Sequence, residues 1–185
     1  MRSKHWLAIA LFAAATVGLC GIGIAAAASG GGDKGEVAVA SQATAHYHQL
    51  DVATGDGYGL FKDVNGIACI EMTGMPEMGA MGIHYVNGAL VGDPSIDAAK
   101  PEALVYEPEG NGRLRLVALE YLVVQSAWDA NHSSPPTLFG QQFNFTPAGN
   151  RYGLPAFYSL HAWIWKHNPS GTFAMWNPTV SCAAA

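Results

Sequence analysis

The stretch FYSLHAWIWKHNPSGTFAMWNP, residues 157–178, carries the strongest fold signal in the chain. Within it, Leu160 to Lys166 is rich in aromatic and β-branched residues and stops at an Asn-Pro-Ser-Gly turn, which predicts a β-strand. A period of two predicts one face made by Leu160, Ala162 and Ile164, and an opposite face made by His161, Trp163 and Trp165. Because each large ring buries about 150–250 Å², we expect this strand to be the central strand of the core.

The composition predicts a folded chain. Of the 185 residues, 50% are hydrophobic and 12% are charged, and this charged fraction is about half of that in typical soluble domains. The formal net charge is -5, and the few lysines and arginines are spread too thinly to form a basic face. We therefore expect no binding to nucleic acid and no attraction to an anionic membrane surface.

The N-terminus predicts export. A short basic region precedes an apolar core at residues 6–17, and Ala26 to Ala28 form a small-residue cleavage site. These features predict a signal peptide over residues 1–28, followed by a flexible glycine-rich linker over residues 29–36. A retained anchor is the competing interpretation, since residues 6–28 are long and apolar enough to cross a bilayer. Cleavage would leave a secreted or periplasmic protein without strong membrane binding.

The cysteines support the same compartment. Cys20 lies in the predicted signal peptide, so the exported chain keeps Cys69 and Cys182. In an oxidising compartment an even pair is most simply a disulfide. We therefore predict a Cys69–Cys182 disulfide that closes a long loop and ties the C-terminal end to the start of the core.

The remaining pattern predicts a single α+β domain over residues 37–182. Helix-forming residues without Pro or Gly predict one N-terminal helix from Val37 to about Val52. Strands are predicted at residues 82–86, 102–107, 113–124 and 160–166, with a short strand near 142–145 inside a long loop at residues 126–153. The expected fold is a mostly antiparallel sheet with the helix packed on one face and the long loop before the last core strand.

Three polar residues interrupt the predicted strands and form the candidate site: His84, Glu120 and His161. Glu120 is predicted to share a face with four apolar residues: Leu114, Leu116, Ala118 and Leu122. Because burial of an unpaired charge is costly, this carboxylate needs a partner or a metal ion. Two imidazoles and a carboxylate are the ligand set of catalytic zinc and of non-haem iron sites. The sequence therefore predicts a site for a divalent metal ion or a small ligand.

Each of the three residues also has a structural interpretation. His84 could be a core histidine with satisfied hydrogen bonds, and His161 could stack on Trp163. Glu120 could form an ion pair with Arg115 or Arg151. Spacing along separate strands does not force the three side chains together, so both interpretations stay open.

Other chemistry has weaker support in the sequence. It contains no nucleophile elbow, no phosphate-binding glycine loop with a following Lys-Ser or Lys-Thr, and no His-Glu-x-x-His motif. Asp129 and His132 could form an acid–base pair but are more simply polar loop residues. Four methionines, Met72, Met75, Met78 and Met81, could bind copper through their thioethers, although packing of loop methionines on the core is the simpler interpretation.

Five segments stand out along the chain: MGIHYVN (residues 81–87), PEALVYEP (101–108), HAWIWK (161–166), NPSG (168–171) and WNP (176–178). They resemble the landmarks of a family of small exported bacterial proteins of unassigned function. The resemblance covers most of the chain from His46 to Cys182. It implies a shared fold and export, and it brings no activity or cofactor.

These observations predict an exported globular protein that binds a metal ion or small ligand at a partly buried His/Glu site. A metal-dependent enzyme of unknown substrate is the first alternative, and it would need an open coordination position. A structural or protein-interaction module of the cell envelope is the second, with the Trp-rich strand and the aromatic loop at residues 139–145 as its partner surface.

Overall fold

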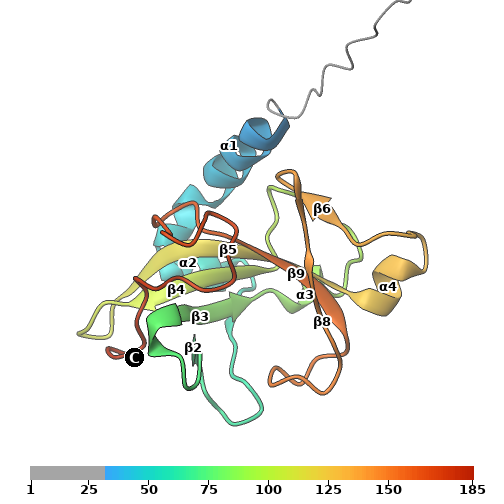
Figure 1. The fold of residues 1–185 in the computed structure, drawn as a ribbon. Coiled ribbons are helices and arrows are strands. Elements are labelled where there is room, and N and C mark those ends of the chain that lie inside the picture. Colours follow the sequence, from blue (N-terminus) through green and yellow to red (C-terminus); the bar gives the residue numbers. More distant parts are fainter. Residues whose placement is uncertain (1–31) are drawn as a thin grey trace, which may run out of the picture.

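An antiparallel sheet of seven strands lies at the centre of the structure, a computed structural model that describes residues 32–185 (Figure 1). Its strands follow the order β1-β3-β4-β5-β9-β8, and β2 also pairs with β3. The strands are β1 (Gly59–Leu60), β2 (Cys69–Glu71), β3 (Ala80–Val86), β4 (Ala103–Pro108), β5 (Leu114–Val124), β8 (Asn144–Thr146) and β9 (Phe157–Ala162). The predicted signal peptide lies outside the described residues.

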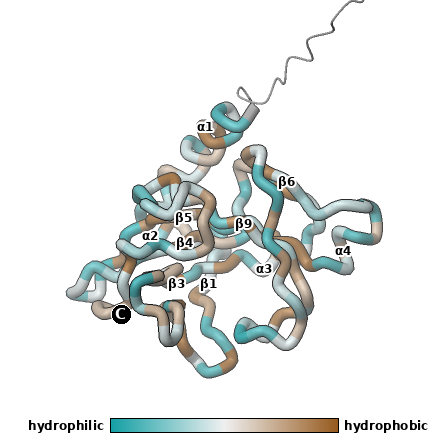
Figure 2. Tube along the Cα trace, viewed as in Figure 1, coloured by the Kyte–Doolittle hydropathy of each residue, from teal (hydrophilic) through white to brown (hydrophobic). Residues whose placement is uncertain are grey.

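Helices cover one face of this sheet, as the sequence predicted. They are α1 (Gly32–Thr44), the 3-10 helix η1 (Ala45–His48) and α2 (Leu50–Gly55). Ala40 of α1 and Ala53 of α2 are buried in the core on this face; in Figure 1, α2 lies at β4 and β5, and the N-terminal part of α1 projects away from the sheet. Figure 2 shows hydrophobic and hydrophilic residues mixed along α1. The helical segment is interrupted after Thr44, whose hydroxyl group donates a hydrogen bond back to the Ala40 carbonyl at 2.8 Å. A bond of this kind competes with the regular helical ladder.

Helix α1 begins at Gly32, inside the segment that was predicted to be a flexible linker. A tertiary contact accounts for the difference, because the Glu36 carboxylate accepts a hydrogen bond from the backbone N–H of Phe139 at 2.7 Å. Such a contact over a long sequence separation is not visible in local composition. Among residues 32–185, no helix combines the length and the apolar character that a bilayer crossing requires.

A β-bulge divides strand β5 into two halves that present different residues to the helices. Val105 pairs with Ala118 and Tyr106 pairs with Leu116, which leaves Val117 as an extra residue. After the bulge, Leu119, Tyr121 and Val123 pack toward the helices, so Ala118, Glu120 and Leu122 lie on the opposite face. Before it, Leu116 is buried in the helix-side core and Leu114 packs against that core. The prediction that Leu114 and Leu116 share a face with Glu120 was therefore wrong.

Strand β9 is shorter than predicted and is not the central strand. It lies between β5 and the three-residue strand β8, while β4 and β5 occupy the centre. The chain leaves the ladder after Ala162, where the Trp163 N–H turns to the Thr172 carbonyl at 2.8 Å. As a result Trp163 packs on the face away from the helices, whereas Trp165 packs on the helix side and donates to the Thr44 hydroxyl at 3.3 Å.

The predicted long loop contains short regular elements. They are α4 (Gln125–Asp129), the hairpin of β6 (Thr137–Leu138) and β7 (Gln141–Gln142), and β8. Leu138, Phe139 and Phe143 from this segment are buried in the helix-side core. Their burial explains why the segment is ordered although its composition is rich in Pro, Asn and Gly. Two further short helices complete the fold: η2 (Pro76–Met78) and α3 (Gly88–Val91).

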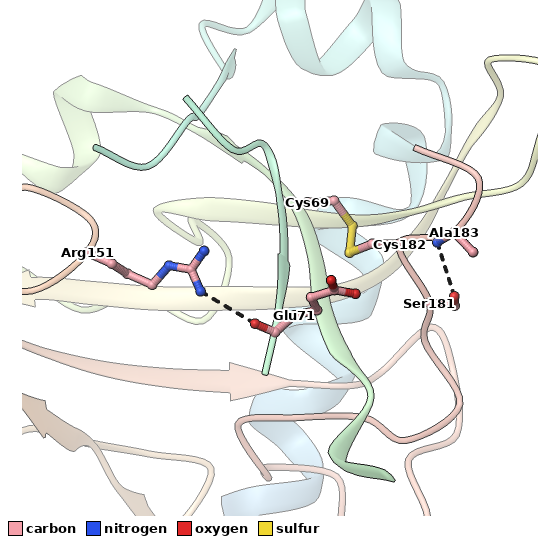
Figure 3. Close-up of a disulfide and its surroundings, with 6 residues drawn as sticks. All are labelled: Cys69, Glu71, Arg151, Ser181, Cys182 and Ala183. Atoms are coloured by element: carbon pink, nitrogen blue, oxygen red, sulfur yellow. Dashed lines mark hydrogen bonds between the residues drawn. A yellow bond between two sulfur atoms is a disulfide. The ribbon is translucent and has the colours of Figure 1, made fainter. Parts of the chain in front are cut away.

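The predicted disulfide between Cys69 and Cys182 is present, with a Cα–Cα distance of 5.7 Å (Figure 3). The C-terminal segment reaches it by running along β3, where Asn177 pairs with Ala80. Near the disulfide, the Arg151 guanidinium donates a hydrogen bond to the Glu71 carbonyl at 3.4 Å (Figure 3). The sheet edge at β2 is thus fixed to both the C-terminus and the loop before β9.

Candidate metal centre

His84, Glu120 and His161 converge on the face of the sheet that points away from the helices. They come from β3, β5 and β9, respectively. Glu120 lies directly opposite His161 in the β5–β9 ladder. His84 reaches Glu120 across β4, and Ala103 is the residue of β4 that pairs with Glu120. The small side chain of Ala103 leaves space above the sheet at this position.

The polar atoms of the three side chains are close together. Nε2 of His84 lies 3.4 Å from Nε2 of His161 and 3.4 Å from Oε2 of Glu120. Nδ1 of His161 lies 3.8 Å from Oε1 of Glu120. One ligand atom from each residue fits within a group whose members are all within 4.8 Å of one another.

The two separations of 3.4 Å are those expected of ligands that share one ion. Zinc bonds of about 2.1 Å in tetrahedral geometry place neighbouring ligand atoms about 3.4 Å apart. Nε2 of His84 has this separation from both Nε2 of His161 and Oε2 of Glu120, whereas the 3.8 Å separation joins the other ring nitrogen of His161 to the other oxygen of Glu120. The group could therefore hold a metal ion, and three protein ligands would leave coordination positions free for other molecules.

Burial controls the protonation of this group. The side chains of His84, Glu120 and His161 are 6%, 13% and 2% exposed. Burial lowers the pKa of His84 and of His161 to about 4, so both imidazoles are neutral near pH 7, which is the form that binds metals. Burial raises the pKa of Glu120, although the nearby His84 and a hydrogen bond from Ser159 act in the opposite direction.

No arginine neutralises Glu120 in the part of the chain that the structure describes. Arg115 pairs with Glu107 and Glu109, and Arg151 pairs with Asp63 at 2.7 Å. The predicted ion pairs of Glu120 with Arg115 or Arg151 are thus wrong, because each arginine has a nearer carboxylate. The stack of His161 on Trp163 is present, with ring centroids 6.2 Å apart.

His84 does not have the satisfied hydrogen bonds of the structural interpretation. Its Nδ1 atom is buried and has no hydrogen-bond partner among residues 32–185. The other ring nitrogen faces Glu120 and His161. The position of this histidine is therefore set by the other two members of the group and by packing.

A cavity of about 120 Å³ adjoins the group. His84 and Glu120 are part of its wall, and Glu102 adds a second carboxyl group there. The other lining residues are mostly apolar, and they are Phe61, Met81, Val86, Val91, Ala103, Leu122, Tyr152, Leu154 and Phe157. A metal ion held by the group would therefore face a space that a small molecule can enter.

Sequence reasoning missed Glu102 as a member of this site. It is 2% exposed, and its carboxylate accepts a hydrogen bond from the Leu122 N–H at 2.9 Å. Burial is the main cause that raises its pKa to about 8, and the nearby charges of Glu120 and Asp93 add to the effect. Its position at the start of an apolar strand could have identified it as a candidate, since a buried carboxylate there also needs a partner.

The structure places the weaker candidates in different surroundings. Asp129 accepts a hydrogen bond from Tyr158 at 3.2 Å, while His132 stacks on Trp128 with ring centroids 3.7 Å apart. These two residues are therefore not an acid–base pair. Among the methionines, Met81 is buried in the cavity wall, whereas Met75 and Met78 are exposed.

Comparisons with known proteins found no matching family model, no matching curated protein and no matching solved structure. The resemblance to a family of exported proteins therefore stays a prediction.

Proposed function

We propose that this protein binds one divalent transition-metal ion through His84, Glu120 and His161. The observation that carries the proposal is the convergence of three buried ligand atoms, from three separate strands, within 4.8 Å of one another. Burying a carboxylate without a cation costs several kcal/mol, and no arginine or lysine among residues 32–185 is paired with Glu120. A bound cation would offset that cost.

The ligand set favours zinc or iron(II) over calcium or magnesium. Imidazole nitrogen suits the transition metals, whereas calcium and magnesium prefer oxygen ligands throughout. Two histidines and one carboxylate with free coordination positions occur both in catalytic zinc sites and in non-haem iron sites. We expect zinc to bind in air, because iron(II) is oxidised there.

A metal-dependent enzyme is the second candidate, and the cavity favours it. His84 and Glu120 both line the cavity, so a free coordination position faces a space where a substrate can bind. A metal ion in such a site lowers the pKa of bound water and polarises substrate oxygens.

We also propose that the protein acts outside the cytoplasm. Support comes from the Cys69–Cys182 disulfide, since such bonds persist mainly in oxidising compartments. The predicted signal peptide at residues 1–28 is consistent with this proposal. Fractionation of cells that express the full chain, followed by mass determination of the processed protein, tests both export and cleavage.

The metal proposal is tested by elemental analysis of protein purified without a histidine tag. We expect about one zinc ion per chain after dialysis against zinc, and loss of that zinc in Glu120→Gln and His161→Gln. His167→Ala is the matched control, because His167 is exposed and lies outside the group.

Folded Glu120→Gln that retains the full metal content would overturn the proposal. Absence of metal from folded wild-type protein, together with unchanged melting in a chelator, would favour the second alternative, an envelope structural or interaction module. Circular dichroism of each variant separates loss of metal binding from loss of the fold.

A further inference from the structure

The cavity beside the metal-binding group has one polar part and a largely apolar remainder. His84, Glu102 and Glu120 supply the ionisable side chains. Aromatic rings from three segments form part of the remaining wall: Phe61, Tyr152 and Phe157. Tyr152 is in edge contact with Phe157 at 6.0 Å between centroids and lies 6.3 Å from Phe61. The aromatic part of the wall is therefore suited to pack against a flat apolar ring of a ligand.

The volume limits the ligand to a small molecule. At about 120 Å³, the cavity is slightly smaller than the cavity of about 150 Å³ that holds benzene in an engineered lysozyme. A single six-membered ring with one substituent is near the upper limit. Sugars and nucleotides are too large, and they would also leave hydroxyl groups unpaired against apolar walls.

Charge defines the polar end of the ligand. A divalent ion with two neutral imidazoles and one carboxylate has a net charge of about +1. One anionic donor atom would neutralise it, whereas a cationic group would be repelled by the ion. Glu102 faces the same space, and one of its oxygens already accepts a hydrogen bond from the Leu122 N–H. A ligand with more than one negative charge would leave an uncompensated charge against the apolar walls, which is costly.

We infer that the ligand of this site is a small monocyclic aromatic molecule with one acidic oxygen or sulfur donor, which binds the metal ion as a phenolate or thiolate. This inference rests on the proposed metal site and adds the class of molecule that the site accepts. On binding, the donor loses its proton to solvent and takes a coordination position, and the ring fills the apolar part of the cavity.

The test uses phenol and toluene, which differ by one hydroxyl group in place of one methyl group. Protein loaded with cobalt(II) reports coordination through its visible absorption, and calorimetry reports the affinity. We expect phenol to change the spectrum and to bind at least tenfold more tightly than toluene. We expect Val91→Phe to weaken phenol binding at least tenfold without change in metal content, because Val91 lines the cavity but is not a proposed ligand.

A matched control is Val39→Phe, which adds the same ring at an exposed position of α1. Metal that binds stoichiometrically while phenol binds no better than toluene would overturn the ligand inference and leave the metal site standing. Failure of cobalt(II) and zinc to bind would overturn the metal site first. If no metal binds, equal binding of phenol and toluene that is lost in Val91→Phe would reduce the cavity to an apolar site and overturn the acidic-donor claim.

Discussion

Glu120 lies directly opposite His161 in the β5–β9 ladder, and the two residues face away from the helices. Their relationship is fixed by strand register, because a slip of one residue would turn one side chain to the opposite face. His84 joins them from β3, on the far side of β4. The group therefore forms only when three consecutive strand pairings are in their native register.

Metal binding should stabilise the folded protein. A ligand present at one hundred times its dissociation constant adds about 2.7 kcal/mol to the free energy of unfolding when only the native state binds it. We expect zinc at this level to raise the melting temperature of the wild type, and Glu120→Gln to remove the increase. His167→Ala should retain it. An equal increase in Glu120→Gln would mean that zinc acts elsewhere.

Glu102 should make the metal-free protein less stable as the pH rises. Its pKa is about 8 in the folded protein against 4.5 for an ordinary carboxyl, so the folded state keeps a proton that the unfolded state has lost. The contribution of this proton to the free energy of unfolding is complete below about pH 4.5 and is lost as the pH rises toward 8. One pKa unit corresponds to about 1.4 kcal/mol. We therefore expect the difference in free energy of unfolding, Glu102→Gln minus wild type, to be roughly 2–4 kcal/mol more positive at pH 8 than at pH 5.

The measurement is urea unfolding of both proteins in a chelator at pH 5, 6.5 and 8. Comparing Glu102→Gln with the wild type cancels the titration of His84 and His161, and the measured difference contains Glu102 together with its coupling to Glu120. Glu77→Gln is the control, because Glu77 is an exposed carboxylate in η2. A stability difference that does not change with pH would show that Glu102 is not protonated in the fold.

The disulfide should contribute to global stability. It joins residues 113 positions apart, and loss of a native disulfide from a small domain costs about 2–5 kcal/mol. We expect Cys69→Ser/Cys182→Ser to lower the free energy of unfolding by this amount in urea titrations. Reduction of the wild type should have the same effect. An unchanged unfolding midpoint in both cases would contradict the prediction.

The ion pair between Asp63 and Arg151 should hold two cavity-wall loops together. The guanidinium donates to the Asp63 carboxylate through Nε and Nη2 at 3.1 and 2.7 Å, and the Val64 N–H donates to the Arg151 carbonyl. Phe61 and Tyr152, close to these residues in the chain, line the cavity. We expect Arg151→Ala to speed hydrogen exchange at Val64 and Ile67 by about an order of magnitude.

Arg113→Ala is the matched control, because the Arg113 side chain is 75% exposed and lies 3.9 Å from its partner Glu109. Its substitution should leave exchange at Val64 and Ile67 unchanged. Equal exchange rates in Arg151→Ala and wild type would show that the loops are held by other contacts.

The strands and the identity of the candidate residues were predictable because both depend on local sequence, whereas the convergence of the three side chains depends on the register of three strand pairings. Apolar alternation located the cores of β3, β4, β5 and β9, and polar residues within those runs identified His84, Glu120 and His161. The disulfide followed from cysteine parity in an oxidising compartment. The antiparallel α+β fold with a helix on one face is confirmed by the sheet and by α1 to α2.

The remaining features could not be predicted from the sequence because they depend on long-range contacts. The β-bulge at Val117 depends on pairing between β4 and β5, and it redirects Leu114 and Leu116 in a way that period-two counting cannot predict. Trp163 and Trp165 separate because the chain leaves the ladder after Ala162 and is then held by Thr172 and Val117. Glu102 lies at the site because several segments together enclose one cavity, and that arrangement is not visible in the local sequence.

The disulfide also determines what a protease can release from this protein. Cys69 and Cys182 enclose most of the sheet and every loop between β2 and the C-terminus. One cut anywhere within that circle, for example in the exposed turn at Pro147 to Gly149, leaves two pieces that remain covalently joined. A nicked molecule would therefore migrate as a single band on a non-reducing gel and separate into fragments only after reduction.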